Sequence, residues 1–335
     1  MTTGVLLMTY GSPKDVADVG AYLTRVRGGR TPSEETLREF ERRYEVIGGS
    51  PLIPITQAQA RGLEEALGPG FVCGAGMRFS EPSVAAVARE LVERGAERLL
   101  GIIISPQYSP IIMGGYGRAL DEAAGPLGVP AGVVEGWWDE PAFVRVMADR
   151  VRRGLERFPA ELREVVPVLL TAHSLPKRVV DQEPGFVVQL KESAGLIAEA
   201  AGLRPEQWRF AYQSAGHTAE EWLKPDILDV LPELAAEGHR HVLLAPVQFV
   251  GDHLETRYDI DVGGKEQADA AGFVGFERAP APNADPDLCR ALAEVVRKAI
   301  AEPSPEPSPT GRGTSLGARH DRHGHPSADR RGRAP

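Results

Sequence analysis

The residue with the clearest chemical potential is a histidine that follows an apolar run. His173 stands in the segment AHSLP, residues 172–176, directly after a stretch of Val and Leu. A neutral imidazole held at the end of a strand suits a proton acceptor or a metal ligand. A hydrogen-bonded structural histidine fits the same position, and the residue pattern alone favours neither.

Three carboxylates follow in a second segment, and their spacing would bring them to one side of a helix. If a helix begins near Gly251, the side chains of Asp252, Glu255 and Asp259 lie at i, i+3 and i+7. Hard oxygen ligands in a line suit a hydrated divalent cation, whereas a solvated acidic helix face is the plainer alternative. His253 is two positions from Glu255, so a regular helix would direct it elsewhere, and we expect it to be structural.

Arginines crowd the segment 25–50, which follows Tyr10 in the chain. Guanidinium forks bind carboxylate or phosphate groups in a bidentate manner, so this segment could clamp an anionic substrate. A solvated helix face is the alternative. The arginines concerned are Arg25, Arg27, Arg30, Arg42 and Arg43.

Composition and missing motifs exclude several classes of protein. The 335 residues carry a formal charge of −9, which argues against nucleic acid as a partner. Cys73 and Cys289 are the two cysteines, too few for an iron–sulfur cluster held by four thiolates. Neither a dinucleotide fingerprint, a Walker loop nor a GxSxG elbow occurs. The apolar runs are too short for a membrane span, and the N-terminus lacks signal-peptide features, so we expect a cytoplasmic protein.

An internal repeat indicates how these residues are positioned. Three pairs of segments match in the same order: 82–95 with 225–238, 141–151 with 286–296, and 5–10 with 168–173. Two of these pairs read as amphipathic helices and the third as a buried strand. The chain therefore predicts two similar α/β halves, each a parallel sheet covered by helices.

The repeat also predicts where the strands lie and where the ligand binds. Ligands of parallel sheets bind at the carboxyl ends of the strands. Tyr10 and His173 occupy equivalent strand ends, so we expect both to face one cleft between the halves. The strands are expected near 4–10, 71–77, 98–105 and 131–137, and near 166–172, 208–213, 241–248 and 272–277.

The two halves differ by an insertion, and the chain ends in a segment without a core. The first half has additional residues, assigned to 25–50, including a charged helix over 31–46. Segment 302–335 has almost no large apolar side chain and is expected to be disordered, although its histidines admit a weaker metal-binding interpretation. We therefore divide the chain into 1–138, 139–285 and the tail, with helix 286–301 as a separate element.

Taken together, these motifs resemble the ferrochelatases, particularly the coproporphyrin type of monoderm bacteria. The resemblance covers about 4–301 and implies two Rossmann-like domains, with helix 286–301 packing back on the first. The motifs that carry it are LLMTYGSP at 6–13, YEVIGGSPL at 44–52, SPQYS at 105–109, AHSLP at 172–176, QS at 213–214, WLKP at 222–225 and DHLE at 252–255.

The resemblance implies a role for each candidate residue. His173 and Glu255 would form the catalytic pair, with His173 as proton acceptor or metal ligand and Glu255 handling the metal. Asp252 and Asp259 would extend the acidic metal path outward, and Tyr10 would approach the opposite face of the porphyrin. The remaining substrate-binding residues would line the rim that carries the propionates: Arg27, Arg30, Arg43, Ser50 and Tyr116.

The short, arginine-rich segment 25–50 and Tyr10 favour coproporphyrin III as the porphyrin, which would be converted to coproheme in haem biosynthesis. Fe²⁺ is then a substrate, and we expect no permanently bound cofactor and no iron–sulfur cluster. A monomer is expected, with a downstream coproheme-processing enzyme as a partner. Three alternatives stay open: a protoporphyrin IX ferrochelatase, a sirohydrochlorin cobaltochelatase, and a tetrapyrrole carrier without catalysis.

Overall fold

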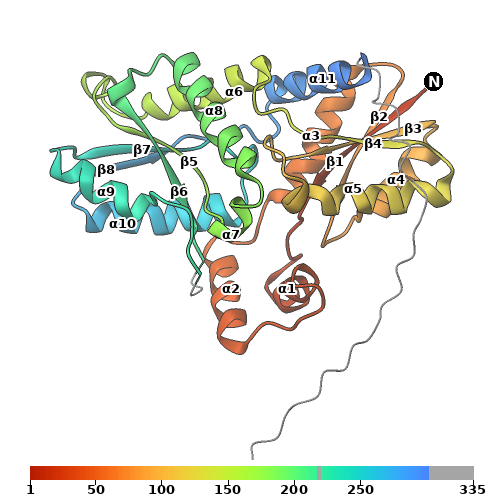
Figure 1. Ribbon diagram of the computed structural model, residues 1–335, viewed down its shortest axis with the longest axis horizontal. Helices are drawn as coiled ribbons and strands as arrows, with labels where there is room; N and C mark the ends of the chain where they lie inside the picture. The colour runs from red at the N-terminus through yellow and green to blue at the C-terminus, as the bar shows by residue number, and fades with distance from the viewer. Residues whose placement is uncertain (217–219, 302–335) are drawn as a thin grey trace, which may run out of the picture.

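The computed structural model describes residues 1–216 and 220–301, which form two α/β halves side by side (Figure 1). The tail that the sequence predicts to be disordered, 302–335, lies outside the described residues. Each half is built on a four-stranded parallel sheet with helices against it. The predicted fold class is confirmed.

The first sheet has the strand order β2-β1-β3-β4. Its central strand β1 is buried along its whole length, because apolar side chains project to both covered faces of a parallel sheet. The strands are β1 (Thr3–Thr9), β2 (Phe71–Met77), β3 (Arg98–Ile103) and β4 (Ala131–Val134).

The second sheet repeats this order as β6-β5-β7-β8. The strand that corresponds to β1 is β5, and it too is central and buried apart from its last residue. The strands are β5 (Val168–His173), β6 (Trp208–Gln213), β7 (His241–Pro246) and β8 (Gly275–Arg278). Tyr10 directly follows β1 and His173 ends β5, so the internal repeat predicts the equivalence of these two positions correctly.

The two repeated amphipathic helices form for local reasons that the sequence carries. Helix α4 (Val84–Glu93) begins after Ser83, whose hydroxyl accepts from the N–H of Ala86. Helix α9 (Ile227–Ala236) begins at a capping box formed by Asp226 and Asp229. Each helix turns its apolar face onto its own sheet.

The remaining helices cover the sheets, join the halves or form the insertion. The α-helices are α1 (Val19–Val26), α2 (Glu34–Val46), α3 (Leu52–Leu67), α5 (Pro110–Ala124), α6 (Pro141–Leu155), α7 (Lys177–Val180), α8 (Pro184–Ala201), α10 (Lys265–Ala270) and α11 (Pro286–Ala301). A π-helix spans Glu255–Gly264, and short 3-10 helices span Val16–Asp18, Gly125–Leu127, Ala160–Leu162 and Pro205–Gln207. No helix in the described part of the chain is long and apolar enough to cross a membrane.

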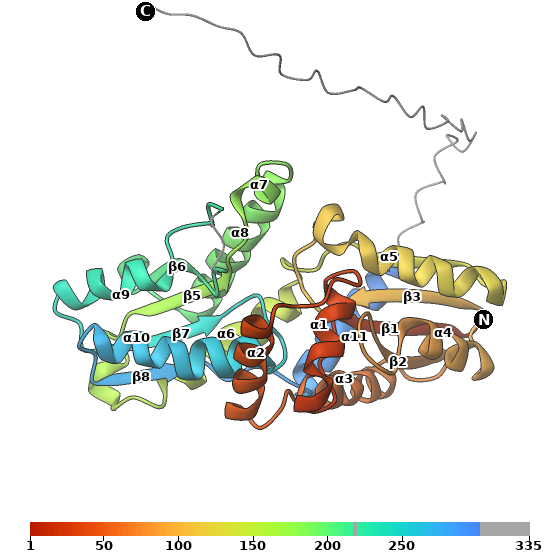
Figure 2. The same cartoon turned by 90° about the horizontal axis from the view of Figure 1, so that it is seen from below.

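The insertion lies where the two halves meet. Helix α2 of the insertion and helix α1, which comes just before it, lie across the middle of the molecule, on the side away from α6 and α11 (Figures 1 and 2). Their apolar side chains form a small cluster of their own around Tyr22 and Tyr44, and Leu254 of the second half packs against it. The insertion therefore touches both halves of the molecule.

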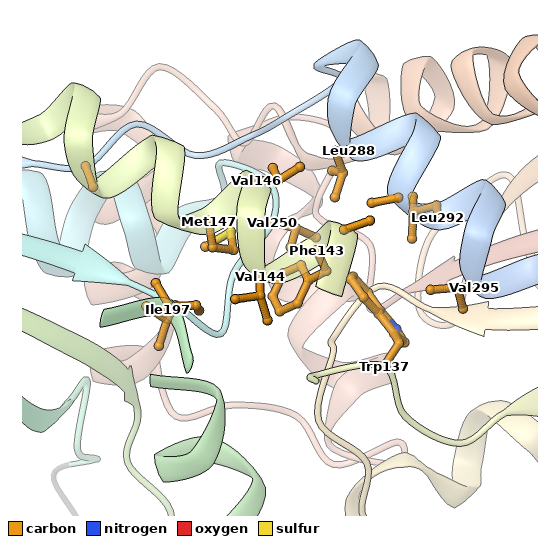
Figure 3. Close-up of a cluster of buried hydrophobic side chains, with 14 of the residues drawn as sticks. Trp137, Phe143, Val144, Val146, Met147, Ile197, Val250, Leu288, Leu292 and Val295 are labelled. Atoms are coloured by element: carbon orange, nitrogen blue, oxygen red, sulfur yellow. The ribbon is translucent and has the colours of Figure 1, made fainter. Parts of the chain in front are cut away.

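One hydrophobic core runs through both halves. The same cluster contains Val5 of β1 and Val168 of β5, and helices α6 and α11 supply much of the packing between them (Figure 3). Helix α11 also packs on α3. That approach is close, because a Cβ at Gly62 of α3 would lie 2.5 Å from the Sγ of Cys289 of α11.

Candidate active site

Two contacts hold His173 so that its ring nitrogen Nε2 faces Glu255. The backbone N–H of His173 donates to Oε1 of Gln248 (2.9 Å), which fixes the end of β5. The ring Nδ1 lies against the carbonyl oxygen of Ser174. Because a carbonyl oxygen can only accept, Nδ1 carries the hydrogen, and Nε2 is the nitrogen that gains and loses a proton. Nε2 lies 3.8 Å from Oε1 of Glu255.

Glu255, the first residue of the π-helix, contacts two imidazole rings. Its Oε1 faces His173, and its Oε2 lies 3.2 Å from Nε2 of His253. Burial opposes ionisation of this carboxyl, but the charge of His173 and the hydrogen bond and charge of His253 outweigh it and lower the pKa of Glu255 to about 2. The side chains of His173 and Glu255 are still 27% and 33% exposed, so an incoming molecule can reach both.

His253 is a site residue that the sequence pattern misplaces. Its Nδ1 lies 3.1 Å from the carbonyl oxygen of Gly251, and its Nε2 faces the carboxylate of Glu255. Both partners can only accept, so both ring nitrogens carry hydrogens and the ring is an imidazolium. Burial disfavours that charge, but the bonds to Glu255 and Gly251 raise the pKa of His253. The prediction that it points elsewhere is wrong, because the helix begins after it.

Asp252 is separated from the other two carboxylates. The π-helix begins at Glu255 rather than near Gly251, so Asp252 lies before the helix and not on its face. Its Oδ2 accepts from Nδ2 of Asn283 (3.0 Å), and its Oδ1 lies 3.1 Å from a guanidinium nitrogen of Arg278. The side chain is buried and paired. The expectation that all three carboxylates share one helix face is therefore wrong for Asp252.

Asp259 does lie on the side of the site, beside the insertion. It is on the same π-helix as Glu255, and its Oδ1 is 3.5 Å from Nη1 of Arg43 of helix α2. Burial raises the pKa of Asp259 and the charge of Glu255 adds to that effect, whereas a hydrogen bond with Ser214 and the charges of Arg43 and His173 lower it. Charged groups from the second half and from the insertion thus act on one carboxylate.

Aromatic side chains gather at the end of β1, in the first half. Tyr10 is 41% exposed, and its ring contacts those of Phe79 (centroids 5.1 Å apart) and Tyr116 (6.0 Å, edge-on). The guanidinium of Arg78 lies over the rings of Phe79 and Tyr116, at 4.8 and 5.5 Å from their centroids. Tyr10 therefore presents an accessible ring that the buried Tyr116 and the partly buried Phe79 hold in place.

Tyr22 lies near both these aromatic side chains and Glu255. Burial raises the pKa of Tyr22, and the nearby groups of Tyr44, Glu255 and Tyr10 raise it further. The Tyr22 hydroxyl donates to the carbonyl oxygen of Gly11 (3.0 Å), next to Tyr10. Tyr10 and Glu255 therefore both lie near Tyr22. No spacing in the sequence identifies Tyr22 or Tyr44 as members of this site.

The other expected rim residues occupy different environments. Arg27 and Arg30 are exposed, and neither forms an ion pair with a residue in 1–216 or 220–301. Ser50 is half-buried, and its hydroxyl accepts from the N–H of Leu52 (3.4 Å) at the start of α3. Tyr116 is buried behind Tyr10, with 3% exposure, so it supports that ring and is itself scarcely accessible.

The donor atoms suit a metal ion in transit. Within the described ranges, no group of three or more His, Cys, Asp or Glu side chains is arranged to hold a metal ion. His173 and Glu255 offer a nitrogen and an oxygen side by side, which leaves further coordination positions of an ion free for water or incoming nitrogen ligands. Such a pair can receive an ion and release it again.

Comparisons with known proteins agree with this geometry. The family model described as Ferrochelatase matches residues 2–300. A Ferrochelatase of Herpetosiphon aurantiacus is 38% identical over 301 residues, covering 88% of this chain and 98% of its own length. A Coproporphyrin III ferrochelatase of Anoxybacillus flavithermus is also 38% identical, covering 88% of this chain and 95% of its own length.

Solved structures share the fold at much lower identity. SirB from Bacillus subtilis with Fe³⁺ has a TM-score of 0.56 at 15% identity and covers 90% of this chain and 96% of that one. CbiX, described as the terminal enzyme for siroheme biosynthesis in denitrifying bacteria, has a TM-score of 0.54 at 13% identity, with coverage of 89% and 99%. At these identities the likeness concerns the two-domain fold.

Proposed function

The chain belongs to the ferrochelatase family, and on this premise we propose that it inserts Fe²⁺ into coproporphyrin III, with His173 and Glu255 as the catalytic pair. The observation that carries the proposal is the His173–Glu255 pair itself: Nε2 lies 3.8 Å from the Glu255 carboxylate, and an accessible Tyr10 follows the equivalent strand of the first half. Iron is a substrate in this reaction, and we propose no resident cofactor.

The proton chemistry follows from the tautomer of His173. Metallation releases two protons from pyrrole nitrogens as Fe²⁺ takes their place. The hydrogen on Nδ1 is held by Ser174, so Nε2 is the nitrogen that accepts a proton. The imidazolium that forms is stabilised by Glu255, whose carboxylate stays ionised. His173 can accept the two protons one after the other, because its side chain is partly exposed and each proton can leave to solvent before the next is taken.

The carboxylates supply the metal side of the reaction. Glu255 and Asp259 offer oxygen atoms to hydrated Fe²⁺, and Glu255 brings the ion beside the proton acceptor. His253 holds Glu255 from the other side and fixes the direction of its Oε1. We place Asp252 with Arg278 and Asn283 as a support of this segment, since its oxygens already have protein partners.

Support for coproporphyrin as the porphyrin comes from charge. Coproporphyrin carries four propionates and protoporphyrin two, so the former needs more cationic groups around its rim. Arg27 and Arg30 are exposed cations of the insertion, and Arg43 lies at the junction of the halves. Several relatives named Coproporphyrin III ferrochelatase are 35–38% identical to this chain. Others of similar identity are named Ferrochelatase.

An anaerobic insertion assay with purified protein tests the proposal. We expect kcat/KM for Fe²⁺ insertion to be about tenfold or more higher with coproporphyrin III than with protoporphyrin IX, since each additional propionate gains a charge-assisted contact. A higher kcat/KM with protoporphyrin IX would contradict the substrate assignment. Preference for Co²⁺ with sirohydrochlorin would instead identify a cobaltochelatase, and tight porphyrin binding without any turnover would identify a carrier.

A further inference from the structure

Arg43 of helix α2 holds two carboxylates at unequal distances. Its Nε donates to Oε1 of Glu39 (2.8 Å), and its Nη1 reaches Oδ1 of Asp259 at 3.5 Å. Its guanidinium also lies over the rings of Phe40 and Tyr258, at 5.5 and 5.1 Å. Stacking and the bond to Glu39 fix the plane of the guanidinium, while the bond to Asp259 is long and made by a single nitrogen.

Asp259 depends on this arginine for its counter-charge. Its side chain is 17% exposed, and in the described part of the chain Arg43 is the cation within ion-pair distance of it. Glu255, on the same helix, repels its charge. A half-buried carboxylate in this position is costly without a cation nearby. If Arg43 turns to another anion, Asp259 loses its ion-pair partner and keeps only the Ser214 hydrogen bond and the weaker influence of His173, so a new cation would be favoured there.

We propose that Arg43 exchanges Asp259 for a propionate when the porphyrin binds, and that this exchange releases the Asp259 carboxylate to Fe²⁺. The inference rests on the proposed function and extends it by ordering the two substrates. A propionate can pair with the fork of Arg43 in a bidentate manner, which is stronger than the long, single contact with Asp259. The freed carboxylate then recruits the ion on the same π-helix as Glu255.

The equilibrium binding of coproporphyrin III without metal gives the sharpest test. The exchange and a fixed structural clamp predict changes of opposite sign in the porphyrin affinity of Asp259→Asn. In Asp259→Asn the arginine is already free, so we expect coproporphyrin III to bind about threefold more tightly than to the wild type, the size typical of one partly exposed ion pair. A clamp that only orders the site would make the same variant bind more weakly. Porphyrin fluorescence titration measures the affinity.

A double-mutant cycle separates the exchange from a general charge effect. Removing any negative charge near the site could favour an anionic porphyrin. If the gain comes through Arg43, Asp259→Asn adds nothing in an Arg43→Gln background, where binding is already weakened. Arg42 is the matched control: it contacts Glu39 and Tyr258 but not Asp259, so the gain persists in an Arg42→Gln background.

The kinetics of Fe²⁺ insertion supply a second readout. At saturating porphyrin, Asp259→Asn is expected to raise the KM for Fe²⁺ by about threefold or more with a smaller change in kcat. Weaker or unchanged porphyrin binding by Asp259→Asn, a gain that survives Arg43→Gln, or an unchanged KM for Fe²⁺ would overturn the exchange. If the wild type does not bind coproporphyrin III at all, the proposed function itself fails.

Discussion

His173, Glu255 and His253 form a row in which each group fixes the protonation of the next. The Ser174 carbonyl assigns the hydrogen of His173, Glu255 lies between the two rings, and the Gly251 carbonyl completes the charge of His253. A carboxylate flanked in this way stays ionised while the His173 ring gains and loses a proton. The three side chains therefore act as one unit.

This unit makes a prediction about stability and pH. The pKa of Glu255 falls from 4.5 to about 2 in the folded chain, so its ionised form stabilises the fold fully above about pH 4.5 and loses this effect as the pH falls toward 2. We expect the Tm difference between wild type and Glu255→Gln to shrink as the pH is lowered from about 6 to 3. Thermal unfolding at each pH measures it, and a difference that widens with acid would contradict the assignment.

At this scale, residue types were predictable and orientations were not. The residue pattern of His173, Glu255 and Asp259 left plainer structural alternatives open, and the resemblance to the ferrochelatases selected these residues as candidates. The pairing of Asp252 with Arg278, and the bond from His253 to Glu255, depend on where the helix starts. A regular helix from Gly251 gives the wrong answer for both residues.

The elements around the site owe their shape to packing that local sequence does not specify. The segment Glu255–Gly264 forms a π-helix, with i→i+5 hydrogen bonds, where carboxylate spacing suggested an α-helix. Leu254, just before it, packs against the insertion. The repeat of helices α4 and α9, by contrast, was predictable, because each carries a polar cap and an apolar face within its own segment.

A pair of glycines tests the packing of helices against one another. Gly62→Ala places a Cβ 2.5 Å from Sγ of Cys289, so α3 and α11 must separate, and we expect a loss of about 1–3 kcal/mol in the free energy of unfolding. Gly195→Ala in α8 is the matched control: nothing lies within 4 Å of its Cβ, so the better helix former should stabilise by about 0.5–1 kcal/mol. Denaturant unfolding gives both values, and the same sign for both variants would contradict the packing of α3 on α11.

The whole molecule combines two repeated halves with a hydrophobic core that is continuous between them. The two sheets have equivalent strand orders, as the internal matches predict. The division at residue 138 stays a prediction, because the main hydrophobic cluster includes Val5 of one sheet and Val168 of the other. The contact of α11 with α3 and α6 could not be read from the repeat, since it joins segments far apart in the chain.

Such a core predicts that the halves unfold together. Phe143 of α6 is fully buried and packs edge-on against Trp137, with ring centroids 4.9 Å apart. Phe143→Ala should cost about 3 kcal/mol or more and lower a single calorimetric transition by about 5 °C. Two separate transitions, with only one of them shifted, would show that the halves fold independently.

The central claim is that the lone pair of His173 takes the protons that iron replaces. His173→Ala removes the acceptor but leaves Tyr10 and the arginines of the insertion in place. We predict that this variant binds coproporphyrin III with a Kd within about twofold of the wild type, while anaerobic insertion of Fe²⁺ falls by about a hundredfold or more. Binding and turnover should be measured on the same sample, and turnover equal to that of the wild type would contradict the claim.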